Sequence, residues 1–318
     1  MIGWYCRRSK LKIIGLGKYT PERVLTNDEI QETVNTSSEW IKERLGIDER
    51  RISNNDERTS DLAFKASVKA LESCNMSIDE IDLIIVATST PDRKSPSTAC
   101  ILQEKFTCKN IPAFDVNAVC SGFIYGLDIC SSLLMSGKYK KILLVGAEQY
   151  STITDWDRRD CVFFGDGAGA VILEKDNNSY FRSLIKADGK GKENFTVPRG
   201  SQYFEMNGKE VFKQATMVLP DSIIELLESN NLNTDDVDLC VPHQPSIKIL
   251  ELTAKKIGLP FHKVARTMNK YANTAGASIP ITLCDSYENG RLKKGDLVLF
   301  TAVGSGWTWG SAIMRWSI

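Results

Sequence analysis

A helix end, a turn and a strand occur twice in this chain. Residues 70–86 recur at residues 226–242, where seven positions are identical at a spacing of 156 residues. A second motif begins at Ser136 and leads into an apolar strand; it is repeated from Asn289 at a spacing of 153 residues. Because both motifs repeat in the same order, the chain is predicted to contain two copies of one structural unit.

Each copy alternates short apolar strands with amphipathic helices. The expected strands are residues 83–87, 113–118, 142–145, 169–174, 239–241, 297–302 and 312–316, and the expected helices are residues 60–75, 120–136, 210–229, 246–257 and 279–289. This alternation favours an α/β fold with mainly parallel sheets covered by helices. The polar segment 175–208 is expected to form loops that join an N-terminal half, residues 1–175, to a C-terminal half, residues 176–318. A ligand site is expected between the halves, at the strand ends.

Composition excludes some function classes. Lys plus Arg equals Asp plus Glu at 40 each among 318 residues, so no overall charge favours nucleic acid or a membrane surface. No apolar run reaches the length of a membrane-spanning helix, and the start of the chain lacks the apolar region of a signal peptide. We therefore expect a cytoplasmic protein whose nine scattered cysteines are reduced, and two histidines predict no zinc site.

Cys120 is the candidate nucleophile. The strand before it ends near Ala118, and an apolar helix is expected to begin at once, which puts the sulfur at a helix N-terminus. There the free N–H groups and the positive end of the helix dipole would stabilise a thiolate. The alternative is one more buried structural thiol, but the position between strand and helix favours the nucleophile.

His243 and Asn273 are the candidate partners of this cysteine. His243 follows the strand at residues 239–241, at the edge where the cleft between the halves is expected, although a lone histidine there is more often structural. His262 lies in a charged loop and is expected to be a solvated surface residue. Adding the repeat spacing of 153 to Cys120 gives Asn273, whose amide could donate to an oxyanion rather than serve only as a turn residue.

Two glycine-rich segments precede or join strands. Residues 164–170 lead into a strand instead of a helix, so tight backbone packing is favoured over phosphate binding. Residues 302–310 join the last two strands. They are expected to form a hairpin turn, or to offer backbone N–H groups near the nucleophile.

In this order and in these contexts, Cys120, His243 and Asn273 resemble the catalytic residues of the ketoacyl-acyl carrier protein synthase III family of the thiolase superfamily. The resemblance covers nearly the whole chain, through residues 35–41, 44–47, 157–158, 165–170, 241–244, 273–274 and 309–310 and the Cys120 turn. It implies a thiolase-like α/β fold: a duplicated five-layer αβαβα architecture with two pseudo-symmetric halves.

The resemblance also implies the chemistry. Cys120 would be acylated by an acyl-coenzyme A primer, with the N–H groups of Cys120 and Ser305 forming the oxyanion hole. Malonyl-acyl carrier protein would then bind, and His243 and Asn273 would hydrogen-bond its thioester carbonyl during decarboxylation. The resulting carbanion would attack the acyl-cysteine. The reaction requires no metal or redox cofactor, and the family is usually homodimeric.

Further binding residues follow from the same resemblance. Trp40, Arg44 and Arg158 would hold the adenine end of coenzyme A by stacking and pairing. The basic residues that would dock the acidic carrier protein are Lys213, Lys248, Lys255 and Lys256. A solvated helix face explains these lysines equally well.

The chain departs from the family pattern at several positions. Pro245-Ser246 follows His243-Gln244 where the family has Ala-Asn, and Ala272 replaces a glycine before Asn273. In the acyl pocket, Ser95 and Val303 each stand where a phenylalanine is common, which predicts a roomier pocket. Ser305 itself replaces a glycine beside the nucleophile.

Three alternatives to a fatty-acid starter enzyme remain open. The first is a specialised condensing enzyme or acyltransferase of secondary metabolism with the same fold, which the substitution Pro245-Ser246 favours. The second is a non-catalytic partner subunit, against which the intact Cys120, His243 and Asn273 argue. The third is a cysteine hydrolase that uses Cys120 and His243.

Overall fold

Two β-sheets form the framework of the molecule. The computed structural model describes residues 10–108 and 110–318, so the chain start used above to judge export lies outside the described residues. One sheet has the order β1 (Leu11–Tyr19), β7 (Asp166–Lys175), β6 (Lys141–Gln149), β4 (Leu83–Ala87), β5 (Ala113–Val116). The other has the order β11 (Leu239–Pro242), β12 (Leu297–Gly304), β13 (Thr308–Arg315), β8 (Phe181–Ala187). The strands of each sheet thus come from one side of residue 175, although the division into two domains there stays a prediction.

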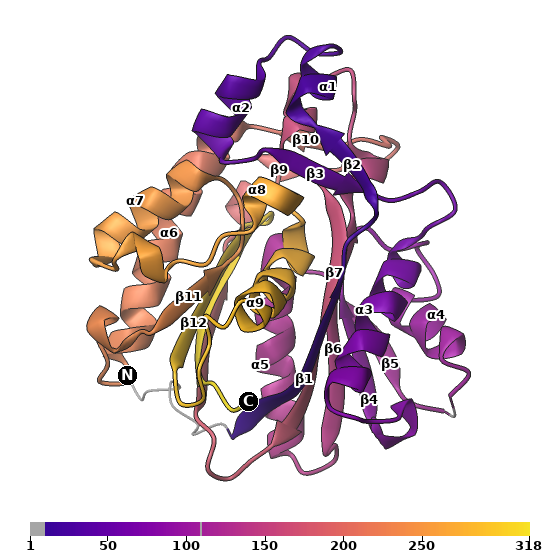
Figure 1. The fold of residues 1–318 in the computed structure, drawn as a ribbon, viewed down its shortest axis with the longest axis vertical. Coiled ribbons are helices and arrows are strands. Elements are labelled where there is room, and N and C mark those ends of the chain that lie inside the picture. The colour runs from indigo at the N-terminus through magenta and orange to yellow at the C-terminus, as the bar shows by residue number, and fades with distance from the viewer. Residues whose placement is uncertain (1–9, 109) are drawn as a thin grey trace.

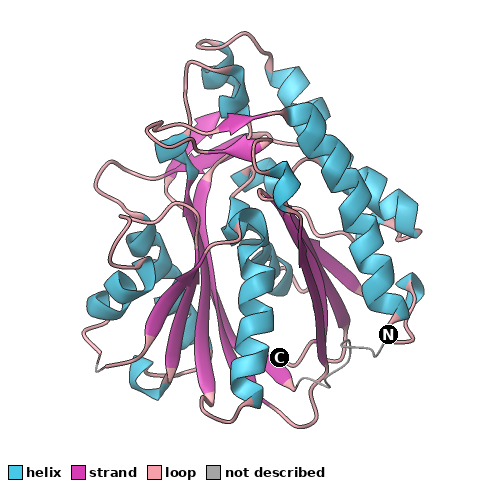
Figure 2. Ribbon diagram, turned by 180° about the vertical axis from the view of Figure 1, so that it is seen from behind, coloured by secondary structure: helices cyan, strands magenta, loops and turns pink. Residues whose placement is uncertain are grey.

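Helices complete five layers, as predicted. The central helices α5 (Gly122–Met135) and α9 (Ser278–Glu288) stand between the sheets, with α3 (Thr59–Ser73) and α4 (Thr98–Lys105) outside the first sheet and α6 (Gly208–Glu228) and α7 (Ile247–Ile257) outside the second (Figure 1). The view from behind shows α5 between the two groups of strands (Figure 2). α5 is apolar nearly all round because both of its faces are covered.

The sheets are mixed, so the prediction of mainly parallel sheets was wrong. β4 pairs in parallel with β5 and β6, and β11 pairs in parallel with β12. β7 runs antiparallel to both of its neighbours, and so does β13. β8 also lies inside the segment that was expected to form only loops. β12 and β13 form the predicted hairpin, with Gly304 opposite Thr308.

Small elements cover the upper end of the sheets. They are the hairpin of β2 (Arg23–Thr26) and β3 (Glu49–Ile52), the hairpin of β9 (Phe195–Thr196) and β10 (Glu205–Met206), and the helices α1 (Asn27–Gln31), α2 (Ser38–Leu45) and α8 (Met268–Tyr271). Within the described residues, no helix combines the length and the apolar character needed to cross a membrane.

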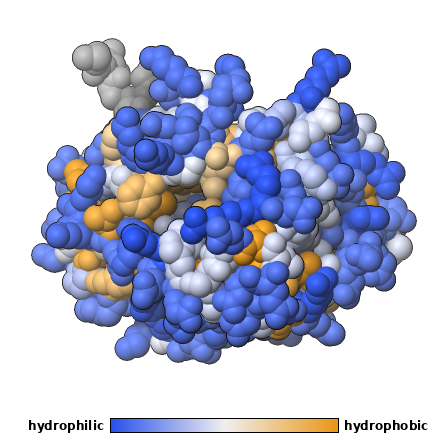
Figure 3. Space-filling model, turned by 90° about the horizontal axis from the view of Figure 1, so that it is seen from above, coloured by the Kyte–Doolittle hydropathy of each residue, from blue (hydrophilic) through white to orange (hydrophobic). Residues whose placement is uncertain are grey.

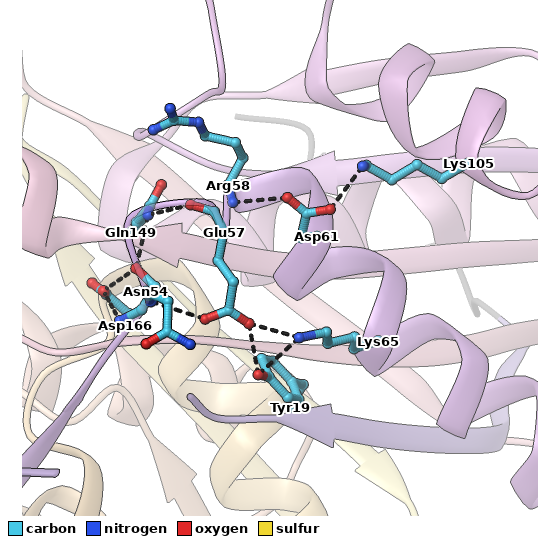
Figure 4. Close-up of polar contacts among 10 residues, drawn as sticks. Tyr19, Asn54, Glu57, Arg58, Asp61, Lys65, Lys105, Gln149 and Asp166 are labelled. Carbon is cyan, nitrogen blue, oxygen red and sulfur yellow. Dashed lines mark hydrogen bonds and ion pairs between the residues drawn. The ribbon is translucent and has the colours of Figure 1, made fainter. Parts of the chain in front are cut away.

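A polar network anchors the loop after β3 to the first sheet. The Glu57 carboxylate accepts hydrogen bonds from Tyr19 at 2.7 Å, from Lys65 at 2.6 Å and from the Asn54 backbone N–H at 3.0 Å (Figure 4). The Gln149 amide donates to the Glu57 carbonyl at 2.8 Å. The network therefore fixes the end of β6, which leads directly to the candidate site.

Candidate active site

Cys120 lies in a single turn between β5 and α5. This 3₁₀ turn, η2, spans Val119–Ser121, and α5 begins at Gly122, two residues later than predicted. Val119 adopts a left-handed conformation with φ of 48°, which turns the chain sharply before the cysteine. The sulfur therefore lies beside a helix N-terminus, as the sequence predicted.

A matching turn lies in the second half of the chain. This turn, η8 (Ala275–Ala277), precedes α9 as η2 precedes α5, and Ala275 has φ of 42°. An added Cβ on Gly276 would come within 3.1 Å of the Val119 carbonyl oxygen, so the two turns face each other at close range. The predicted meeting of the two turns is confirmed.

The repeat spacing that led to Asn273 needs a correction. The two turns and the strands β6 and β12 are all 156 residues apart, so the counterpart of Cys120 is Gly276 and that of Asn273 is Asn117. The spacing is 153 only in the loop that joins each helix to the next strand, because α9 has 11 residues and α5 has 14, and a longer loop before β12 restores the spacing of 156. Both asparagines accept from the backbone N–H two residues on, at 2.8 Å for Asn273 and 3.4 Å for Asn117.

Backbone hydrogen bonds from the segment just before β7 hold Asn273 in place. The Asn273 N–H donates to the Phe163 carbonyl at 3.0 Å, and the Gly165 N–H donates to the Asn273 carbonyl at 3.1 Å. An added Cβ on Gly165 would lie 2.7 Å from the Tyr271 carbonyl oxygen. The prediction that residues 164–170 serve tight packing is therefore confirmed.

His243 follows β11 and reaches the same place. Its backbone N–H donates to the Thr301 carbonyl of β12 at 2.8 Å, and its ring Nδ1 lies 2.8 Å from the Ser278 hydroxyl at the start of α9. Burial lowers the pKa of His243 to about 3, so the ring is neutral at physiological pH. His262 is exposed, as expected.

One cavity of about 700 Å³ joins these residues. Cys120, His243 and Asn273 all line it, together with Val303 and Ser305. The three residues proposed from the sequence therefore do meet at a common space. The face that carries α2 and the β9–β10 hairpin is hollowed, and hydrophobic surface borders the hollow (Figure 3).

The thiol of Cys120 does not have the low pKa that the sequence predicted. Burial raises its pKa, and the carboxyl of Glu148 adds to the rise. Glu148 is fully buried at the end of β6, where it accepts from Thr90 and Ser89, and burial raises its pKa to about 7. Desolvation of the buried thiol therefore outweighs the helix N-terminus at this sulfur.

The turn between β12 and β13 is tied to the cysteine turn. Ser121 donates to the Thr308 carbonyl at 3.0 Å, and the Thr308 hydroxyl donates to the Ala118 carbonyl at 3.0 Å. These bonds bring Ser305 to the cavity wall, where its hydroxyl donates to the Phe195 carbonyl. The placement is compatible with an oxyanion hole formed by the N–H groups of Cys120 and Ser305.

The residues expected to hold coenzyme A are only partly brought together. Trp40 and Arg44, both on α2, line the cavity. Arg158 is exposed and forms an ion pair with Asp160 at 2.9 Å. The guanidinium that stacks on Trp40 belongs instead to Arg159, 4.3 Å from the ring centroid. Arg159 was not predicted, although it stands next to Arg158 in the sequence.

The four lysines form one exposed area beside the cavity. Lys213 is on α6 and the other three are on α7, and Lys256 reaches across to the Thr216 carbonyl of α6 at 2.6 Å. Lys248 and Lys255 line the cavity itself. Nearby glutamates lie 3.8 Å from Lys213 and 2.9 Å from Lys248.

Of the two acyl-pocket residues, Val303 lines the cavity, whereas Ser95 is exposed before α4 and lies outside it in a single chain. A cluster of aromatic side chains packs beside Cys120. Tyr150 stacks on Phe164 with centroids 4.5 Å apart, and Phe195 stacks on Phe204 at 5.3 Å.

Comparison with known proteins identifies the family. Residues 114–189 match the family described as 3-oxoacyl-[acyl-carrier-protein] synthase III, and residues 227–316 match its C-terminal part. A β-ketoacyl-[acyl-carrier-protein] synthase III of Clostridium perfringens is 45% identical over 96% of this chain and 98% of its own length. The chain belongs to this family. A β-ketoacyl-[acyl-carrier-protein] synthase III of Xanthomonas campestris is also 45% identical, over 98% of this chain and 99% of the relative.

Solved structures support the same family assignment. The synthase III of Aquifex aeolicus superposes with a TM-score of 0.94 at 42% identity, covering 96% of this chain and all of that one. The priming β-ketosynthase of the R1128 polyketide pathway superposes at 0.92 with 28% identity, covering 98% and 97%. The protein is thus a condensing acyltransferase of the synthase III type with a thiolase fold.

Proposed function

We propose that this synthase III loads an acyl group from acyl-coenzyme A onto Cys120 and condenses it with malonyl-acyl carrier protein. The observation that carries the proposal is the convergence of Cys120, His243 and Asn273 on one cavity. The names of the relatives, which are synthases acting on acyl carrier protein, support the second substrate.

In the first half-reaction, the Cys120 sulfur attacks the thioester carbonyl of the primer. The N–H groups of Cys120 and Ser305 stabilise the oxyanion, the bond to the coenzyme A sulfur breaks, and the thiol proton of Cys120 leaves with that sulfur. Because burial raises the pKa of Cys120, attack and proton loss are coupled and no free thiolate accumulates.

In the second half-reaction, the malonyl thioester loses carbon dioxide, and its carbonyl becomes an enolate oxygen. His243 and Asn273 each donate a hydrogen bond to that oxygen. The enolate carbon then attacks the acyl-Cys120 carbonyl, the C–S bond breaks, and the 3-oxoacyl thioester departs. The Cys120 sulfur leaves as a thiolate and takes up one proton from solvent, which restores the thiol. The two thioesters and this proton balance the reaction, which needs no metal or redox cofactor.

Coenzyme A and the acyl carrier protein bind at the rim of the cavity. Trp40, Arg44 and one or both of Arg158 and Arg159 hold the adenine end of coenzyme A. The lysine area formed by Lys213, Lys248, Lys255 and Lys256 docks the acidic carrier protein, since two of the four border the cavity.

The test of this function is intact-mass spectrometry. The protein is incubated with acetyl-, butyryl- or octanoyl-coenzyme A, and we expect the mass of one acyl group on Cys120. Cys120→Ala should gain none, whereas His243→Ala and Asn273→Ala should still acylate and lose condensation with malonyl-acyl carrier protein. Complete loss of acylation in both folded variants would refute this division of roles, and release of free acid would indicate a hydrolase.

A specialised condensing enzyme is the second candidate. Two observations favour it: the likeness to a polyketide priming ketosynthase, and the residues Pro245-Ser246 beside the catalytic histidine. Ser246 is the N-cap of α7 and accepts from the Ile249 N–H at 3.4 Å, so its side chain is committed to the helix. Product analysis with malonyl-acyl carrier protein and malonyl-coenzyme A in parallel separates the two candidates.

A homodimer is part of the proposal. β5 is the edge strand of its sheet and pairs only with β4 among the described strands, and its Phe114 is 38% exposed. An apolar edge strand of this kind favours pairing with a second copy. In such a dimer Ser95 could reach the partner's cavity. The cytoplasmic location stays a prediction.

A further inference from the structure

The hydrogen of the neutral His243 ring can sit on either nitrogen, and the two forms do opposite chemistry. With the hydrogen on Nε2, the ring can donate to a substrate oxygen in the cavity. With the hydrogen on Nδ1, Nε2 can only accept. Because the ring is buried and 3% exposed, the protein around Nδ1 decides which form exists.

Ser278 is the donor that the structure offers to Nδ1. Its hydroxyl oxygen lies 2.8 Å from Nδ1. The nearby Ala275 N–H is already used, because it donates to Asn273 Oδ1 at 2.8 Å. Within residues 10–108 and 110–318, no second donor to Nδ1 is recorded.

The Ser278 hydroxyl has one hydrogen and two acceptors within reach. Besides Nδ1, the Ala275 carbonyl oxygen lies 2.8 Å from Oγ. That carbonyl already accepts the backbone N–H of Ser278. The hydroxyl can therefore donate either to this carbonyl, which already has a donor, or to Nδ1, which has no other donor and needs one whenever the ring hydrogen is on Nε2.

We propose that Ser278 is a positioning residue that donates to His243 Nδ1 and so keeps the ring hydrogen on Nε2. Residues of the η8 turn and the start of α9 then hold His243 and Asn273 so that each presents a hydrogen-bond donor to the cavity. The Ala275 N–H holds Asn273 by its oxygen, which leaves the Asn273 NH₂ as a donor, and Ser278 holds His243 by Nδ1, which leaves Nε2–H as a donor.

The inference rests on the proposed function, because two donors are what an enolate oxygen needs. It adds that Ser278 acts in the condensation half-reaction and not in acylation. Without its hydroxyl, the neighbouring Ala275 carbonyl, an acceptor, would draw the hydrogen to Nδ1. His243 would then present a lone pair to the enolate and repel it.

Nitrogen-15 NMR of the histidine rings reads the hydrogen position directly. The chain has only two histidines, His243 and His262, so His262→Gln leaves a single ring to assign. At pH 7 we expect the long-range ¹H–¹⁵N pattern of the Nε2–H form in the wild-type protein. The pattern of the Nδ1–H form would overturn the inference without the use of any variant at Ser278.

Ser278→Ala should convert the ring to the Nδ1–H form. Acylation of Cys120, measured by intact mass, should stay within about twofold, while the condensation rate falls on the order of 100-fold, the usual cost of one lost oxyanion donor. Ser278→Thr keeps the hydroxyl and should restore the Nε2–H form. An unchanged condensation rate in folded Ser278→Ala would overturn the inference.

Ser286→Ala is the matched control. Ser286 is also buried on α9, and its hydroxyl donates to the Thr282 carbonyl at 2.7 Å. This variant should keep both half-reactions within about twofold, since it loses a similar helix bond away from His243. If His243→Ala itself keeps full condensation, the proposed function fails, whereas the NMR pattern tests the role of Ser278 independently of the reaction.

Discussion

Ala272, the residue before Asn273, has a backbone conformation that favours glycine. Its φ is 54° and its ψ is −151°, and the residue is 1% exposed. A side chain in this region costs about 1–3 kcal/mol. The family resemblance predicts a glycine at this position, so the alanine is a strained residue directly beside the Asn273 amide.

Ala272→Gly should therefore stabilise the protein. The relief of strain exceeds the added freedom of glycine in the unfolded chain, and we expect the free energy of unfolding to rise by about 1 kcal/mol. Denaturant unfolding measures it. Ala277→Gly is the control, because Ala277 is also buried but has an ordinary φ of −84° and should lose stability. Equal losses of unfolding free energy in both variants would contradict the inference that the backbone of Ala272 is strained.

The raised pKa of Cys120 predicts a pH dependence. Only the thiolate reacts with iodoacetamide, so the alkylation rate of Cys120 should keep rising through pH 9, above the usual thiol range. Peptide mapping by mass spectrometry gives the rate, with the exposed Cys100 as an internal reference. A plateau below pH 8 would mean that the helix N-terminus of α5 outweighs burial.

At the scale of elements, buried strands and their neighbouring helices were predictable. β4, β6, β11 and β12 are continuous apolar runs, and the structure has them within a few residues of the expected bounds. β8 was missed because it is an edge strand in which only Phe181 and Leu184 are buried. Its sequence carries little of the signal that burial on both faces imposes.

Strand direction and side-chain partners could not be read from the sequence. Antiparallel pairing of β7 and β13 depends on which sheet edge each connection reaches, and no local pattern encodes that. Cys120 and His243 were proposed because each follows a strand end, and Asn273 was proposed from the repeat spacing; all three line the same cavity. Arg159 was missed because the choice between two adjacent arginines depends on how the short helix η4 (Arg159–Val162) directs them.

The η4 segment gives a prediction of its own. If adenine stacks at Trp40, Arg159→Ala should raise the KM for acyl-coenzyme A about threefold with little change in kcat, in line with an exposed cation–π contact of 0.5–1 kcal/mol. Arg158→Ala should have a smaller effect, because its guanidinium pairs with Asp160. Steady-state kinetics of both variants tests this prediction. A larger rise in KM for Arg158→Ala than for Arg159→Ala would assign the adenine contact to Arg158.

At the scale of the molecule, the exposed edge of β5 predicts the oligomeric state. Sedimentation should give twice the 35.5 kDa chain mass, and Phe114→Glu should produce monomers, since a two-fold axis at this strand would bring like charges together. Met135→Glu is the control, because Met135 is 39% exposed at the far end of α5. A Phe114→Glu protein that remains dimeric would place the contact elsewhere.

The central layer has a consequence for how such a chain could have arisen. α5 comes from the first half and α9 from the second, and the same apolar core contains residues of both. A lone half would leave one side of its inner helix uncovered. The first half would have Cys120 but no histidine, and the second would have His243 but glycine in place of the cysteine at the matching turn. An ancestor of half this length would thus have been obliged to pair with its own copy, and gene fusion then allowed the two turns to specialise, one keeping a sulfur and the other becoming a glycine.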